Sequence, residues 1–431
     1  MTKDPESFRP PRRWRTPPAP LQGSGELEGI SILREFPGDT GGLLWQSLRA
    51  VTLWAGIPPA RRARLFNPGV AELRGQEVEQ LPFPELREAL RGVLGLLREP
   101  DTVDAGVVSA ACVAVARWAA GRAAPTTEMD FLTAAALASP SDPALALTAA
   151  RGLRDRGLYV HAEGWYQRSV ALARRAEEWE PYARAYVGLG KTWSAQGRLL
   201  QARRSFDKAF RAARRHGIGE VQGMALHDLF ALDAQLGDHA SALRMAAAAT
   251  RAYGPGHRLL PALAHDVARF WLERGEPGLA LPVLQAVVPR LHPARRPVAV
   301  GNLGLAAARE GMPETFWEAW REVTALPDDA PDKAESLALL ARGALALDLA
   351  ECAEETIRRT REIAGARGEL GVLKEMDELH HTLEADPATA RGRHPEPEVT
   401  AAKVPAEAEQ AAARLRTRLV AFLAASAPTD M

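Results

Sequence analysis

The sequence predicts an all-α protein whose central part is a solenoid of antiparallel helix pairs. Turn residues recur at separations of 36, 40, 40, 38, 36 and 37 residues, at Gly121, Gly157, Gly197, Gly237, Gly275, Gly311 and Asp348. A period of this length is typical of stacked helical repeats. Alanine-rich helical patterns fill the intervals, and alternating β-branched runs are nearly absent. We therefore expect close-packed helices and no large sheet.

Composition places the chain among soluble, folded proteins, with 46% hydrophobic and 25% charged residues in 431. The 54 basic and 54 acidic side chains give a formal net charge of zero, so no overall field attracts nucleic acid or an anionic membrane. The most apolar helix, 107–116, stops at Arg117, short of the roughly 20 residues that a membrane span requires. Proline rather than an apolar core follows the N-terminal arginines, which excludes an ordinary secretory signal. We expect a cytoplasmic protein.

The chain before the repeats falls into two parts. Residues 1–24 are rich in Pro and Arg and predict a disordered arm, whose segment RPPRRWR has basic and aromatic residues suited to nucleic acid or an acidic partner. Residues 25–103 predict a divergent helical region with helices at 42–56 and 84–98. The segment between them, 67–84, gives no clear element.

The helical pairs, a linker and a last helix form the rest of the chain. The pairs occupy residues 104–384, residues 385–403 have the composition of a linker, and residues 404–431 hold a C-terminal helix and tail. That last helix, at 407–425, has Ala411, Leu415, Leu419 and Phe422 on one side. It could cap the solenoid, fold back into its groove or dimerise. Capping an open apolar end is the most economical interpretation.

The stretch AYVGLGKTWSAQG, 185–197, contains a Gly-Leu-Gly-Lys-Thr sequence that is similar to a phosphate-binding loop. Such a loop requires a glycine five residues before its second glycine and a strand immediately upstream. Ala185 occupies the glycine position, and the preceding residues have a helical period. Gly190 is therefore interpreted as a packing glycine, and Gly197 as a turn residue.

One unit carries the resemblance to a known family. Its residues are Tyr186, Leu189, Gly190, Trp193, Gly197, Ala202, Phe206 and Ala209. At these spacings the unit resembles the tetratricopeptide repeat (TPR) in its long bacterial form. The resemblance covers about residues 143–365 and implies a right-handed superhelical solenoid. The other units match fewer positions, and Arg214 stands where the family has a terminal proline.

The resemblance also implies which side chains line a concave groove, because the family uses fixed positions of the first helix in each pair. Carried over to this chain, these positions hold Arg151, Arg154, Arg184, Lys191, His227, His265, Arg269 and Arg342. Acidic residues are scarce in the set, Glu335 being the exception. A groove lined in this way favours an acidic peptide, because Arg and Lys form charge-assisted bonds to carboxylates. The alternative is an ordinary solvated helix face.

Catalytic and cofactor-binding patterns are weak. The pair His380-His381 lacks the zincin spacing, so we expect no metal site. Cys112 and Cys352 are expected to be free thiols. Trp317 and Trp320, three residues apart, indicate repeat packing, with a ligand platform as the alternative. We expect no enzyme activity, no cofactor, and no binding to nucleic acid or membrane by the folded array.

The function predicted from these observations is a non-enzymatic scaffold or adaptor that binds a peptide or partner domain in the groove. The alternative is a ligand-sensing regulator whose repeats bind a signal and control a transcription factor or enzyme. No recognition helix of helix-turn-helix type is evident, which argues against direct DNA binding. The sequence specifies neither the partner nor the oligomeric state.

Overall fold

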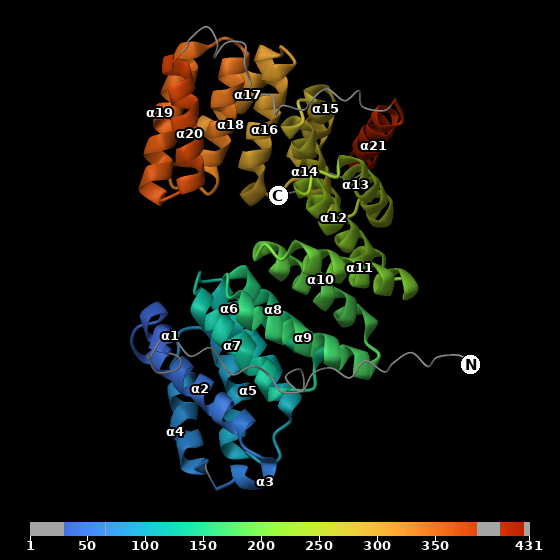
Figure 1. The fold of residues 1–431 in the computed structure, drawn as a ribbon. Coiled ribbons are helices and arrows are strands. Elements are labelled where there is room, and N and C mark those ends of the chain that lie inside the picture. The colour runs from blue at the N-terminus through green and yellow to red at the C-terminus, as the bar shows by residue number, and fades with distance from the viewer. Residues whose placement is uncertain (1–29, 65, 386–405, 426–431) are drawn as a thin grey trace, which may run out of the picture. The chain divides into compact units, whose positions relative to one another are not determined.

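The computed structural model describes residues 30–64, 66–385 and 406–425, and every regular element in these ranges is a helix (Figure 1). The all-α class is therefore confirmed. The chain divides into two compact units, residues 1–225 and 226–431, with the boundary inside helix α12 (Gly219–Gln235). The N-terminal arm and nearly all of the linker expected from the sequence lie outside the described residues.

The first half of unit 1 contains seven helices in the part that the structure describes. They are α1 (Ile30–Glu35), α2 (Asp39–Gly56), α3 (Pro59–Arg62), α4 (Pro68–Glu79), α5 (Pro84–Arg98), α6 (Ala105–Ala120) and α7 (Pro125–Ala138). Helices α2 and α5 are the two that the sequence predicts, although α2 begins three residues earlier. Helix α4 corrects the expectation for 67–84. Its start is fixed by Asn67, whose side chain accepts a hydrogen bond from the Gly69 amide, and by Pro68 in the first turn.

The carboxylate of Glu35 joins α1 to the start of α7. It accepts hydrogen bonds from the Thr126 and Thr127 amides at 2.8 Å and from the Thr127 hydroxyl at 2.7 Å. Burial alone would raise the pKa of Glu35, but these hydrogen bonds outweigh it and hold the pKa below its usual value. A carboxylate at a helix N-terminus satisfies amides that have no partner within the helix.

The second half of unit 1 follows the predicted order of helix, turn and helix. It contains α8 (Pro143–Asp155), α9 (Tyr159–Ala176), α10 (Trp179–Ala195) and α11 (Leu199–Arg215), each packed on the next. Gly190 has the packing role expected of it. A Cβ built at this position would lie 2.5 Å from Cδ1 of Phe206, so only glycine lets α10 approach the ring on α11. The chain around Lys191 is helical on both sides, with no strand upstream.

Unit 2 continues the helix pairs. After the end of α12 come α13 (His239–Tyr253), α14 (Leu260–Glu273), α15 (Pro277–Val287), α16 (Arg296–Arg309), α17 (Pro313–Thr324), α18 (Lys333–Ala346), α19 (Ala350–Arg367), α20 (Leu370–Ala385) and α21 (Ala406–Ala424). Two short 3-10 helices, η2 (Val288–Arg290) and η3 (Pro293–Arg295), lie between α15 and α16. Figure 1 shows α16 to α20 side by side, in agreement with their packing contacts.

The turns between paired helices use the left-handed backbone region. Positive φ angles of 68 to 76° occur at Gly157, Gly197, Gly237, Gly275 and Gly311. Asp348 has a φ of 56°, so it takes the glycine-type conformation as its place in the period suggests. Gly121 has a φ of −63° instead, and the positive φ of that turn, 54°, falls on Ala123. A longer turn before Pro125 moves the left-handed residue two positions along the chain.

The C-terminal helix α21 packs on α15, α13 and α14. Ala412, Leu415, Leu419 and Leu423 form its buried face. The expected Leu415 and Leu419 are confirmed, whereas Ala411 is exposed and Phe422 is half-buried. The apolar face of α21 is therefore buried in contacts with helices of the middle of unit 2.

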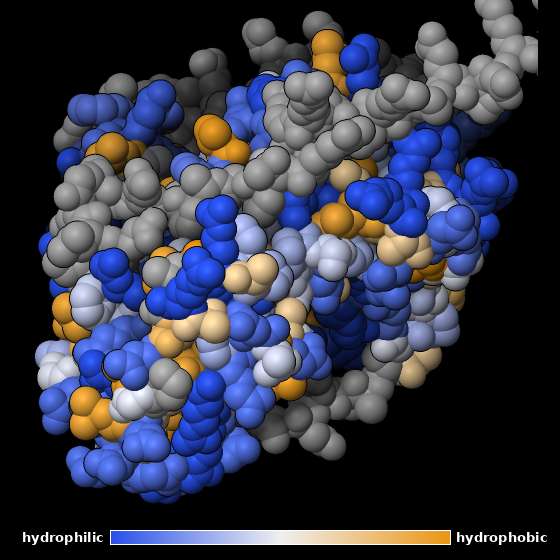
Figure 2. Space-filling view, turned by 90° about the horizontal axis from the view of Figure 1, so that it is seen from below, coloured by the Kyte–Doolittle hydropathy of each residue, from blue (hydrophilic) through white to orange (hydrophobic). Residues whose placement is uncertain are grey.

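The surface of the described residues is mostly polar. Figure 2 shows hydrophilic residues over much of the visible face, with hydrophobic residues in scattered groups. None of the described helices combines the length and the apolarity needed to cross a membrane. Cys112 is buried and Cys352 is half-buried, and both are free thiols. Trp317 and Trp320 pack against the fully buried Phe316, although Trp317 remains 38% exposed.

Candidate interaction surface

In each helix pair of the array, we call the earlier helix the first helix and the later one the second helix. Consecutive first helices contact each other: α8 contacts α10 in unit 1, and α14, α16, α18 and α20 follow one another in unit 2. Small residues permit this approach. A Cβ on Gly301 of α16 would lie 3.0 Å from the Ser336 carbonyl oxygen of α18. The exposed side chains of neighbouring first helices therefore belong to one surface within each unit.

In unit 1, at least two of the four predicted groove cations form ion pairs, Arg154 and Arg184. Arg154 lies 2.5 Å from Oδ1 of Asp155 and donates to the Tyr166 hydroxyl at 3.2 Å. Arg184 contacts Glu180 at 2.9 Å, one turn earlier in α10, and Glu220 at 3.2 Å, on the start of α12. Arg151 is exposed on α8, and Lys191 is half-buried on α10. The positive charge of this face is therefore partly neutralised.

Unit 2 brings His227 and His265 into one cluster of polar groups. His227 on α12 donates from Nε2 to Oδ2 of Asp266 on α14 at 2.8 Å. The amide of Asn302 on α16 donates to Nε2 of His265 at 3.1 Å. With Nε2 accepting, the proton of the neutral His265 ring is on Nδ1, 3.9 Å from Oδ1 of Asp266. These contacts link three consecutive first helices.

Burial and charge set the protonation of this cluster. Burial lowers the pKa of His265, and the attraction of Asp266 only partly opposes this shift. Burial would raise the pKa of Asp266, but the hydrogen bond from His227 and the nearby positive charges outweigh it and lower that pKa. The cluster therefore favours a neutral His265 beside an ionised Asp266, an arrangement that can donate and accept hydrogen bonds.

The remaining unit 2 residues of the predicted set differ in exposure. Arg269 on α14 is 55% exposed, and its ion pair with Glu273 at 3.4 Å is equally open to solvent. Arg342 on α18 forms an ion pair with Glu375 on α20. Partial desolvation, with the like charge of Asp332, raises the pKa of Glu335, while Arg269 opposes this rise. Among the predicted groove residues of unit 2, Arg269 is therefore the cation most open to a partner.

Sequence reasoning missed the groups that pair with the predicted cations. Glu220, Asp266, Asn302 and Glu375 each lie on the first helix that follows their partner's. The separations of these contacts are 36, 39, 37 and 33 residues, about one repeat period. The period itself was the signal that could have identified them. We call these four contacts, Arg184–Glu220, His227–Asp266, His265–Asn302 and Arg342–Glu375, the polar row.

The polar row changes the expected charge of the surface. Partly exposed ion pairs contribute little to stability, about 0–1 kcal/mol each, but they do reduce the net positive charge that a partner meets. The first helices thus present both signs of charge within each unit. In the described residues, no three His, Cys, Asp or Glu side chains are grouped so that they could hold a metal ion.

Comparison with known proteins assigns the chain to no family. No protein-family model matches the chain, and a search of curated proteins finds no match. The resemblance to TPR proteins therefore depends on the residues of the best unit and on the period of the turns.

Proposed function

We propose that this chain is a non-enzymatic interaction protein of TPR type that binds a peptide or partner domain on its first helices. Its helix pairs would coil into the right-handed superhelix that the family forms, with the first helices on the concave side. The observation that supports the proposal most is the direct packing of α14, α16, α18 and α20, which gives their polar side chains one shared surface. We place the protein in the cytoplasm.

The polar row refines the class of partner. Arg184 in unit 1, and His227 and Arg342 in unit 2, already contact Glu or Asp. The first-helix surface of each unit would therefore select for a partner with spaced charges of both signs rather than for a uniformly acidic one. Of the predicted groove cations in unit 2, Arg269 would form the most favourable contact with a partner carboxylate, because its ion pair with Glu273 is exposed and weak.

A photocrosslinking side chain at position 269 tests this proposal. The full chain with the probe at 269 is compared with the full chain carrying it at 251, an exposed arginine position on the second helix α13. Bound proteins are captured from cell extract and identified by mass spectrometry. We expect a partner to crosslink from 269 and not from 251, and Arg269→Glu to weaken its capture by about fivefold, the effect of about 1 kcal/mol. Equal crosslinking from both positions would contradict the proposal.

A ligand-sensing regulator is the second candidate, and the cluster of His227, Asp266, His265 and Asn302 favours it. These half-buried donors and acceptors could bind a small polar molecule. Such a ligand would raise the unfolding temperature, because it binds only the native state. Stabilisation by the low-molecular-weight fraction of the extract, lost in His265→Gln, supports the sensor, and its absence supports the scaffold.

A further inference from the structure

Although the whole chain has a formal net charge of zero, one segment of it is strongly basic. Residues 151–218 contain fifteen Arg and Lys side chains but only six Asp and Glu. The remainder of the chain therefore has the opposite excess. Helix α11, with the sequence LLQARRSFDKAFRAARR, has six basic residues and one acidic residue. A local field of this kind selects partners even when the whole molecule is neutral.

The basic residues of α11 are sorted onto one face. Ala202, Phe206, Ala209 and Ala213 are buried on the side toward α10. On the opposite side Arg204, Lys208, Arg211 and Arg215 are all exposed. Their spacing of four, three and four residues puts them in line along the helix. We call these four residues the α11 basic face, which extends about 16 Å along the axis at 1.5 Å per residue.

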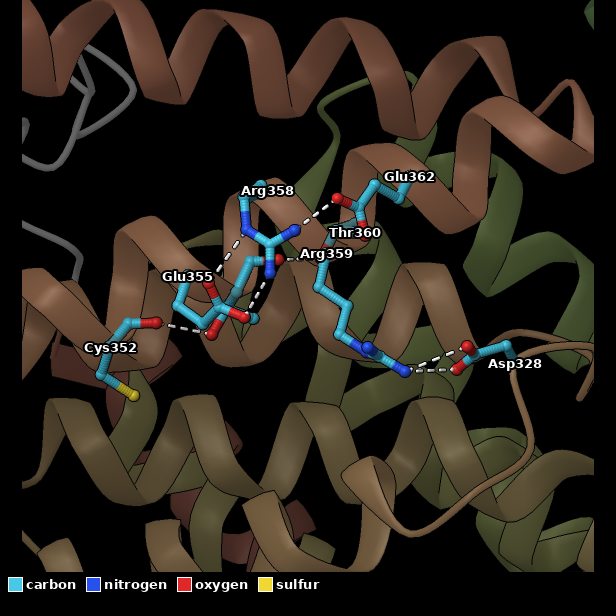
Figure 3. A network of polar contacts seen from close by, with 8 residues as sticks. Asp328, Cys352, Glu355, Arg358, Arg359, Thr360 and Glu362 are labelled. Atoms are coloured by element: carbon cyan, nitrogen blue, oxygen red, sulfur yellow. Dashed lines mark hydrogen bonds and ion pairs between the residues drawn. The ribbon is translucent and has the colours of Figure 1, made fainter.

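This face is not neutralised by the rest of the described chain. Within those residues, no carboxylate lies at ion-pair distance from Arg204, Arg211 or Arg215. Lys208 has only a cation–π contact, 5.3 Å from the ring of Tyr186. The second helix α19 differs from α11. On α19, Arg358 lies between Glu355 and Glu362, and Arg359 contacts Asp328 at 2.9 Å (Figure 3).

An apolar residue extends the α11 basic face and indicates the class of partner. Leu200 lies one turn before Arg204 on the same side and is 76% exposed. A leucine in this place gains from contact with an apolar protein side chain and gains nothing from a phosphate backbone. Insertion into a membrane would require the apolar face of α11, which is already buried against α10.

We propose that the α11 basic face and Leu200 bind an acidic amphipathic helix of a partner protein. The partner helix has carboxylates at the same spacing of four, three and four residues, so each meets one cation, and an apolar side chain one turn beyond them meets Leu200. The proposal rests on the proposed function only in that the partner is a protein. It concerns a second helix in unit 1 and does not require binding at the first helices of unit 2.

Fluorescence anisotropy with a defined peptide tests the proposal. The probe is a labelled alanine-based peptide of about 20 residues, long enough to form helix, with four Glu at this spacing and one Leu beyond them. A second peptide has the same composition with its Glu spread around the helix. The charge-reversal variant is Arg204→Glu/Arg211→Glu. Its matched control is Arg244→Glu/Arg251→Glu, two exposed arginines with the same seven-residue separation on α13.

We expect the wild-type full chain and the control variant to bind the aligned peptide with equal affinity and the spread peptide at least about tenfold more weakly. Arg204→Glu/Arg211→Glu should weaken binding of the aligned peptide by at least about tenfold, and raising the salt about threefold should weaken wild-type binding, because exposed charge pairs are screened. Arg269→Glu should bind the aligned peptide as the wild type does. This variant therefore separates the proposal for the α11 basic face from the proposal that a partner binds on the first helices.

Three results would overturn the proposal. The first is no binding of the aligned peptide to the wild-type chain, and the second is equal binding to Arg204→Glu/Arg211→Glu. The third uses a DNA duplex of about 20 base pairs: tighter binding of the duplex than of the peptide, lost in the same variant, would assign the α11 basic face to nucleic acid.

Discussion

At the residue scale, three glycines in the first helices face aromatic rings on neighbouring helices. A Cβ on Gly190 would overlap Phe206, one on Gly188 would lie 2.7 Å from the Tyr166 hydroxyl oxygen, and one on Gly343 would lie 2.8 Å from Cε2 of Phe316. These neighbouring helices approach closely because a side chain is absent at each of the three positions. Gly365 on α19 offers a contrast, since a Cβ there would meet no atom within 4 Å.

The first of these contacts leads to a stability prediction. Gly190→Ala should lower the free energy of unfolding by about 1–3 kcal/mol, because the added methyl group overpacks the contact with Phe206. In Gly190→Ala/Phe206→Leu the smaller leucine side chain makes room for the added methyl group. The loss in free energy of unfolding, measured by urea denaturation, should therefore be smaller than the sum of the losses in the two single variants.

The control for this prediction is Gly365→Ala. It should be neutral or stabilising by up to about 1 kcal/mol, because alanine has the higher helix propensity and the site is open. Equal losses in Gly190→Ala and Gly365→Ala would mean that contact with Phe206 is not the reason for the glycine.

Sequence reasoning reached Gly190 because its unit resembles the TPR pattern at eight positions. It missed Gly188, since a glycine that faces a ring in the preceding pair can be identified only when the distance between pairs is known. The polar row was missed for a related reason, because charge pairing depends on the register of two helices that are about one period apart.

At the scale of elements, helices with a continuous apolar face were predicted well, and those without one were not. Helix α5 buries Leu86, Leu90 and Leu94 on one side and was placed at its observed bounds. Helix α4 exposes Val70 and Leu73 by 40% and 53%, so its apolar residues follow no helical stripe. Its turn chemistry at Asn67 and Pro68 was the available signal.

The position of α21 gives a prediction at this scale. Leu419→Asp puts a charge into the contact of α21 with α13 and α15, where burial of an unpaired carboxylate costs several kcal/mol. We expect amides of 406–424 to lose hydrogen-exchange protection while those of α16 to α20 keep it. Thr417→Asp, on the exposed side of the same helix, should leave the protection of 406–424 and of α16 to α20 unchanged. Unchanged protection in Leu419→Asp would mean that α21 is held by other contacts.

At the scale of the whole molecule, local packing is the main principle from α8 to α20, because these helices contact their sequence neighbours and consecutive first helices within each unit contact each other. Such arrays gain stability from each repeat and from its interfaces with adjacent repeats. A disturbance in one unit should therefore stay near its origin. The period of the turns predicted this organisation, whereas composition alone did not, since a neutral, alanine-rich chain suits many helical folds.

Hydrogen exchange in two glycine variants tests this account most directly. Gly190→Ala should lower amide protection in α8 to α11 and leave α16 to α20 unchanged, whereas Gly343→Ala should lower protection in α16 to α20 and leave α8 to α11 unchanged. A uniform loss of protection across both units in either variant would contradict the account.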